Sequence, residues 1–208
     1  MKFFMLSCVA IVTMLSLSCS AQKAGKTSNE SLVKMYAQEA NRLDLQTNKD
    51  SIDRAYKLHT KILKLDKKQV PSYRSKIAIE YKRGYIKKAL NTANAFVINL
   101  PDYADAWVYL GIVQTKLADS LKALASFKKA ISLYSNQIAE VEDSSWQNDL
   151  KFKQAIVVNF LGIKEPVYAE SSTDKNGNAN SMTVHINDIE TVEAYVNKFM
   201  TYNGIQFF

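Results

Sequence analysis

Cysteine is scarce in this chain of 208 residues, which contains only Cys8 and Cys19. Because both lie at the N-terminal end, the chain beyond Cys19 can form no disulfide. It also has no thiolate metal ligand and no cysteine nucleophile. Any fold after Cys19 must therefore be stabilised by packing of its apolar residues, which make up 47% of the chain.

Residues that commonly carry catalysis or bind metals are also few. The two histidines, His59 and His185, do not stand at a spacing typical of metal ligands. No glycine-rich phosphate-binding loop and no serine-nucleophile motif occurs. We therefore expect a non-enzymatic protein that needs no cofactor and no metal, with His59 packed in a core. The alternative is an enzymatic site built into residues 166–208.

The chain is basic, with 27 Lys and Arg against 20 Asp and Glu. Part of this charge is a block in which Lys57, Lys61, Lys64 and Lys68 follow a 4-3-4 spacing. That spacing places the four side chains on one face of a helix. A solvated helix face explains the block more simply than an anionic partner does, and we expect no nucleic-acid binding.

Residues 1–21 have the pattern of an export signal, in which Lys2 precedes an apolar segment. The segment is shorter than the roughly 20 residues that a transmembrane helix needs. Its end resembles a bacterial lipoprotein signal, which implies lipidation of Cys19, although Leu17 stands closer to the cysteine than in the usual pattern. We expect a membrane-anchored lipoprotein of the cell envelope that faces the periplasm, with residues 22–30 as a tether. The alternative is cleavage near Ala21 and a secreted or soluble periplasmic scaffold.

A period of about 34 residues organises the middle of the chain. Ala55, Ala89 and Ala123 recur at this spacing. The clearest copy, residues 104–137, contains Trp107 followed at fixed spacings by Leu110, Gly111, Ala123, Phe127 and Ala130. Because a helix pair cannot bury its apolar face alone, such a period predicts stacked helical hairpins.

This pattern resembles the tetratricopeptide repeat, whose signature is Trp-x2-Leu-Gly followed by small and aromatic residues on a second helix. The resemblance implies a mostly α-helical fold, a short array of helical hairpins over residues 31–137. The repeats are expected at about 36–69, 70–103 and 104–137, with helices at 70–83, 86–99, 104–117 and 120–133. A terminal capping helix region is expected at 138–165, where Ser144 or Ser145 would cap a new helix.

Residues 166–208 do not continue the repeat. Pro166 ends the helical pattern, and two alternating runs flank a turn-rich segment that contains Asn176 and Gly177. This arrangement predicts a β-hairpin, followed by a closing helix over 189–202. We therefore expect a small C-terminal appendage.

The resemblance also implies a function, because tetratricopeptide proteins are binding scaffolds in which the first helix of each pair lines a concave face. A peptide or protein partner is therefore expected on that face. Neither the partner nor the oligomeric state follows from the sequence. The expected lining residues of two successive repeats are Arg74, Tyr81 and Lys82, then Val108, Ile112 and Lys116.

Overall fold

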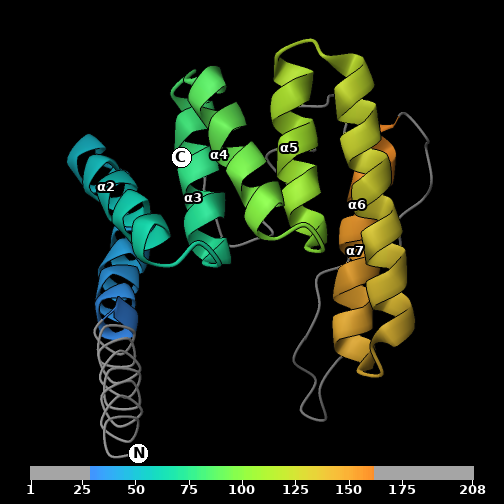
Figure 1. Cartoon of the computed structure of the whole chain (residues 1–208), viewed down its shortest axis with the longest axis horizontal. Coiled ribbons are helices and arrows are strands. Elements are labelled where there is room, and N and C mark those ends of the chain that lie inside the picture. Colours follow the sequence, from blue (N-terminus) through green and yellow to red (C-terminus); the bar gives the residue numbers. More distant parts are fainter. Residues whose placement is uncertain (1–28, 162–208) are drawn as a thin grey trace, which may run out of the picture. The chain divides into compact units, whose positions relative to one another are not determined.

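The structure, a computed structural model, describes residues 29–161, and these residues form helices joined by short turns, with no strand among them (Figure 1). The chain divides into two compact units between Gln69 and Val70. Unit 1 comprises the described residues 29–69, and unit 2 comprises residues 70–161. The export signal, Cys19 and the expected β-hairpin lie outside the described residues and stay predictions.

Unit 1 is one pair of helices, a first helix through residues 29–44 and α2 (Lys49–Leu65). Asn48 caps α2, because its Oδ1 accepts a hydrogen bond from the Ser51 backbone N–H at 2.9 Å. The two helices pack through an apolar seam that includes Val33, Ala40 and Ile62.

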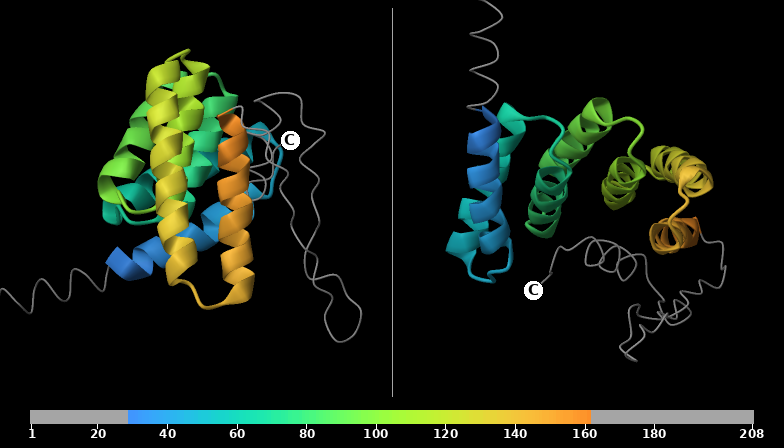
Figure 2. Two further views of the ribbon diagram at one scale, coloured as in Figure 1. Left: turned by 90° about the vertical axis from the view of Figure 1, so that its right-hand side faces the viewer. Right: turned by 90° about the horizontal axis from the view of Figure 1, so that it is seen from below.

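Unit 2 contains five helices that pack against one another in chain order: α3 (Val70–Lys82), α4 (Ile86–Asn99), α5 (Ala104–Lys116), α6 (Ser120–Glu140) and α7 (Ser144–Phe160). The last two, α6 and α7, run side by side (Figure 2). Contacts also join α3 to α5, so the first helices of successive pairs are neighbours.

The period expected from the sequence is present in this architecture. Helices α3 and α5 begin one period apart, at Val70 and Ala104, and α4 and α6 begin one period apart, at Ile86 and Ser120. The three recurring alanines of the sequence are all buried. The prediction of repeated helical hairpins is therefore confirmed for the described residues.

A hydrogen bond between the two helices of each pair repeats with the same period. In the first pair of unit 2, the Thr92 hydroxyl donates to Glu80 Oε2 at 2.7 Å. In the second pair, the Ser126 hydroxyl donates to Gln114 Oε1 at 2.8 Å. All four side chains are buried, so these bonds satisfy polar groups that would otherwise be costly to enclose.

The turns inside the two pairs also match. Gly84 has φ +73°, and Ala118, one period later, has φ +59°. Glycine adopts this left-handed conformation without a steric penalty, whereas alanine does not. Gly111 allows α5 and α6 to approach closely, because it has no Cβ. A Cβ added there would lie 2.5 Å from Phe127 Cε1.

Helix α6 is longer than expected, since it continues to Glu140 instead of ending near residue 133. No glycine or proline interrupts this stretch, and α7 packs along it. The Gln154 side chain of α7 donates to the Ile131 carbonyl at 3.1 Å and to Ser135 Oγ at 2.7 Å. Helix α7 begins at Ser144, and Asp143 accepts a hydrogen bond from the Trp146 N–H at 2.8 Å.

Candidate binding surface

All six of the expected lining residues lie on α3 or α5, the first helices of the two pairs in unit 2. The structure separates them into two groups. Arg74, Val108 and Ile112 lie toward the interior, whereas Tyr81, Lys82 and Lys116 lie at the C-terminal ends of the two helices.

Arg74 belongs to a buried polar network that joins α3 to α5 and α6. Its guanidinium pairs with the carboxylate of Asp105, which is 2% exposed, and donates to the Tyr103 hydroxyl at 2.5 Å. The Tyr134 hydroxyl of α6 donates to the same carboxylate at 2.5 Å. Arg74 therefore connects neighbouring helices inside the fold.

The network changes the ionisation of its members. Burial alone would lower the pKa of Arg74, but the carboxylate of Asp105 and the nearby Tyr103 and Tyr109 hydroxyls together outweigh burial, so the pKa is raised. Burial, and then the same carboxylate, raises the pKa of Tyr103 and of Tyr134. At neutral pH both tyrosines are therefore neutral hydrogen-bond donors.

Stacked aromatic rings flank this network. The rings of Tyr73 and Phe96 lie parallel, with centroids 4.6 Å apart. Phe96 also contacts Tyr103 and Tyr109 at centroid distances of 5.8 and 6.3 Å. This cluster joins α3 and α4 to α5 and to Tyr103, the residue just before α5, and each aromatic pair adds to the stability of the packing.

Val108 and Ile112 are 0% and 1% exposed. Enclosed side chains present no surface to a partner in this structure, so the two residues contribute packing here. Their expected contact with a partner stays a prediction.

Of the expected lining residues at the C-terminal ends of α3 and α5, Tyr81 is half-buried, and Lys82 and Lys116 are exposed. The Lys116 ammonium lies 5.9 Å from the centre of the Tyr81 ring, within the range of a cation–π contact between α5 and α3. Lys82 is exposed, and the partial burial of its ammonium lowers its pKa. The ends of these two neighbouring helices thus carry one aromatic ring in contact with a lysine, and a second lysine next to the ring in sequence.

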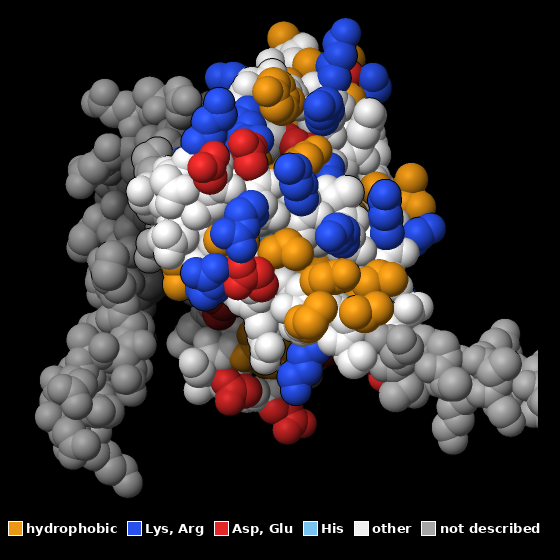
Figure 3. Space-filling view, turned by 90° about the vertical axis from the view of Figure 1, so that its left-hand side faces the viewer, with side chains coloured by type: hydrophobic (Ala, Val, Ile, Leu, Met, Phe, Trp, Pro, Cys, Tyr) orange, Lys and Arg blue, Asp and Glu red, His pale blue; other side chains and the backbone are white. Residues whose placement is uncertain are grey.

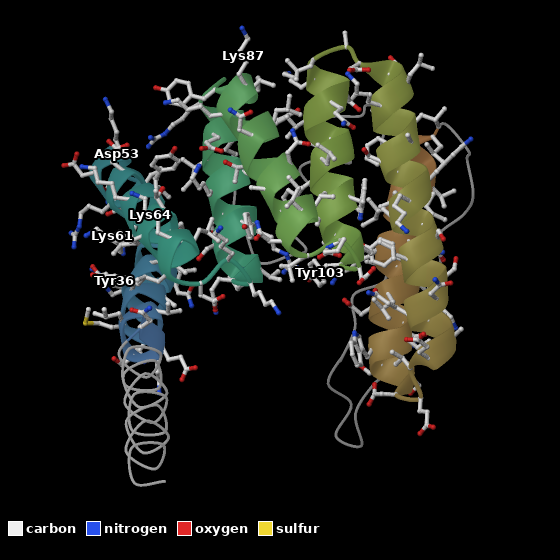
Figure 4. The ribbon with its side chains drawn as sticks, in the orientation of Figure 1. Tyr36, Asp53, Lys61, Lys64, Lys87 and Tyr103 are labelled. Atoms are coloured by element: carbon white, nitrogen blue, oxygen red, sulfur yellow. The ribbon has the colours of Figure 1, made fainter. Side chains whose placement is uncertain are left out.

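The basic block is solvated, as expected, but only Lys57, Lys61 and Lys64 lie on α2, because that helix ends at Leu65 and Lys68 follows it. Lys57, Lys61, Lys64 and Lys68 are all exposed. Lys61 lies 5.4 Å from the centre of the Tyr36 ring of the first helix, and Figure 4 shows Lys61, Lys64 and Tyr36. Basic side chains are spread over the face shown in Figure 3, with carboxylates and apolar side chains between them.

His59 is a core residue, as expected. It is buried, and its Nε2 lies 2.9 Å from Asp44 Oδ2 in the same unit. Within residues 29–161, no group of three or more His, Cys, Asp or Glu side chains is placed to hold a metal ion. In that same part of the chain, no helix combines the length and the apolar character needed to cross a membrane.

Comparisons with known proteins give structural likenesses only. No family model and no curated protein matches the chain. Among solved structures, a MamA protein aligns over 64% of this chain and 66% of its own, with 20% identity and a TM-score of 0.44. A second MamA structure covers 55% of this chain and 61% of its own, at 22% identity and a TM-score of 0.38. The Sgt2 TPR domain from Aspergillus fumigatus covers 71% and 89%, at 18% identity and a TM-score of 0.41.

Two features of unit 2 did not follow from the sequence pattern. One is the burial of the Arg74–Asp105 pair under Tyr134, a residue of α6 that lies outside the repeat signature. The other is a concentration of basic side chains around the two matching turns. The clustering of Lys82, Arg83, Lys87 and Lys88 is visible in the sequence, but their location at one end with Lys116 and Lys122 depends on the stacking of the two pairs.

Proposed function

We propose that this protein is a non-enzymatic scaffold that binds a peptide or protein segment through the C-terminal ends of α3 and α5. The observation that carries the proposal is the contact of the half-buried Tyr81 ring with Lys116, together with the exposed Lys82, on successive first helices. Aromatic side chains are enriched among the residues that dominate binding energy at interfaces. The two lysines would contact a carboxylate of the partner, and Tyr81 would receive an apolar side chain.

The repeated helical hairpins support this proposal, because stacked hairpins hold the first helices of successive pairs side by side. Lys82 and Lys116 stand one period apart and occupy equivalent positions. An extended segment that crosses both helices would therefore meet one cation on each.

A photo-crosslinking residue placed at Tyr81 tests the proposal in cells. We expect a discrete protein adduct with the probe at position 81 or 116. We expect no such adduct with the probe at Lys128, an exposed lysine on the second helix α6. Adducts of equal yield at position 128 would show that recognition does not depend on the ends of α3 and α5.

Alanine variants measured against the captured protein separate the roles of the side chains. Tyr81→Ala should raise the dissociation constant at all salt concentrations, because its contribution is apolar. Lys82→Ala and Lys116→Ala should weaken binding mainly at low salt, because salt screens exposed charges. Lys64→Ala and Lys128→Ala are the controls, and an equal loss in these variants would contradict the proposal.

We also propose that the scaffold is anchored in the bacterial cell envelope by a lipid on Cys19 and faces the periplasm. The pattern of residues 1–21 and the polar tether 22–30 support this proposal. Metabolic labelling with a fatty acid should label the wild-type protein and leave Cys19→Ala unlabelled. Absence of label from both proteins would favour the soluble periplasmic form.

A further inference from the structure

Unit 2 has a strongly uneven distribution of charge along its helices. The α3–α4 turn and the α5–α6 turn lie at the same end of the unit, because α3 and α5 are each followed by a helix that runs back beside them (Figure 1). We call this end the turn edge. It carries the carboxylate of Asp119 and six basic side chains: Lys82, Arg83, Lys87, Lys88, Lys116 and Lys122.

The opposite end of unit 2 has the reverse character. Asp102 lies in the α4–α5 turn, and Glu140, Glu142 and Asp143 lie around the α6–α7 turn. No Lys or Arg occurs between residues 89 and 115 or between residues 130 and 150. Unit 2 is therefore polarised, and an anionic surface would attract its turn edge and repel its other end.

Large apolar side chains project among these cations. Leu121, in the first turn of α6, is 81% exposed, and Leu117, just after α5, is 40% exposed. Tyr85, in the other turn, is 50% exposed, and the Lys88 ammonium lies 4.9 Å from the centre of its ring. Figure 4 shows Lys87 extending from this end of the unit, where α4 begins.

The geometry points to the turn edge as a docking surface for an anionic lipid bilayer. Lysines and arginines near an anionic membrane each contribute attraction, while leucine and tyrosine side chains enter the boundary between headgroups and acyl chains. Here the apolar side chains are exposed in the two connecting turns or in the first turn of the helix that follows. A protein partner would instead be expected to receive its anchors in packed pockets. The inference goes beyond the proposed function, because Tyr85, Lys87, Leu117 and Leu121 are not among the residues proposed to bind a peptide.

Vesicle binding by the full chain carrying Cys19→Ala tests this inference without an acyl anchor. The probes are phosphatidylcholine vesicles and phosphatidylcholine vesicles that contain phosphatidylglycerol. We expect stronger binding to the anionic vesicles and a loss of that difference at high salt. The N-terminal segment with Lys2 and the exposed lysines of unit 1 contribute equally in all variants, so the losses in the turn-edge variants below locate the contact.

Two variants with matched controls locate the contact. Lys87→Ala should weaken binding to the anionic vesicles about fivefold, and Leu121→Ser about tenfold. Lys151→Ala on α7 is the control for charge, because Lys151 is also exposed. Ile98→Ser is the control for apolar character, because Ile98 is 76% exposed near the opposite end of unit 2. Neither control should change binding by more than about twofold.

An environment-sensitive dye reports insertion directly. The dye is attached to Leu121→Cys in a chain that also carries Cys8→Ser and Cys19→Ala. Its emission should shift to the blue with anionic vesicles and stay unchanged with neutral ones. The same emission with both vesicles, or equal losses in the Lys87 and Lys151 variants, would overturn the inference. If the turn edge does not bind anionic vesicles but captures an acidic protein, this edge is a site for a protein partner instead.

Discussion

Replacing Asp105 by alanine tests whether the buried network of unit 2 supports the fold. The Asp105 carboxylate is enclosed and receives hydrogen bonds from Tyr134 at 2.5 Å and from Tyr103 at 3.3 Å, in addition to its ion pair with Arg74. Its removal leaves the mostly buried Arg74 guanidinium without an opposite charge. Breaking one side of a buried ion pair costs about 3–5 kcal/mol. Since domains are typically stable by about 5–15 kcal/mol, the variant should lose a large part of its stability.

The assay is equilibrium unfolding of the full chain in urea, followed by circular dichroism. Asp105→Ala should lower the free energy of unfolding by about 3–5 kcal/mol. The control is Asp102→Ala, which removes an exposed carboxylate close by in the sequence and should change stability by less than about 0.5 kcal/mol. Because the two changes have the same chemistry, their difference isolates the effect of burial.

A double-mutant cycle then shows whether Arg74 and Asp105 act as a pair. Arg74→Leu combined with Asp105→Leu removes both charges, so no unpaired ion remains. We expect the double variant to lose less stability than the sum of the single variants, with a coupling of about 1–3 kcal/mol. Additive effects, or a loss below about 1 kcal/mol in Asp105→Ala, would refute this reasoning. Arg74 would then be available for the peptide binding expected from the sequence.

Three further predictions concern the packing and ionisation of unit 2. Ala123→Leu should overpack the buried contact between α5 and α6 and lower the free energy of unfolding by about 1–3 kcal/mol, measured in urea. Gly111→Ala should lower the free energy of unfolding by about 1 kcal/mol net, because the clash of the new Cβ with the Phe127 ring outweighs the better helix propensity of alanine. Adding Phe127→Leu to this variant should recover stability. If Phe127→Leu does not reduce the loss, the clash is contradicted. The free energy of unfolding should be steady up to about pH 9 and fall above pH 10.0. The fall occurs because tyrosines of the unfolded chain ionise there, whereas Tyr103 and Tyr134 stay protonated in the folded protein. Each of the two tyrosines should contribute a slope of about 1.4 kcal/mol per pH unit. Tyr134→Phe should reduce that slope, and an unchanged slope would contradict the raised pKa.

The helical hairpins could be predicted because their determinants are local and periodic. Small residues recur where second helices pack, and Gly84 and Asp119 mark the turns within pairs. These signals placed the starts of α3, α4, α5 and α6 at the observed residues. The end of α6 could not be placed in this way, because its last turns bond to α7, where Gln154 donates to Ser135 Oγ and Gln147 donates to the Ile138 carbonyl.

The binding surface could be predicted only in part, because position on a first helix does not determine exposure. The residue at a given repeat position is Arg74 in one pair and Val108 in the next. The first is held by Asp105 and the second lies in the core. The exposure of each residue depends on side chains from other helices. The periodic sequence pattern carries no information about these contacts between helices. Tyr81 and Lys116 come together because they lie near the ends of two neighbouring helices, where fewer elements cover them.

The two proposals for unit 2 meet at Lys82 and Lys116. The N-terminal parts of α3 and α5 are joined by the Arg74–Asp105 pair and are buried by packing. The proposed binding surface is therefore at the C-terminal ends of these helices. Those ends adjoin the turn edge, which carries Lys87 and Leu121. A lysine engaged by a partner's carboxylate cannot at the same time neutralise a lipid phosphate. Partner binding and membrane contact should therefore compete for Lys82 and Lys116, whereas Lys87 and Leu121 should affect membrane contact alone.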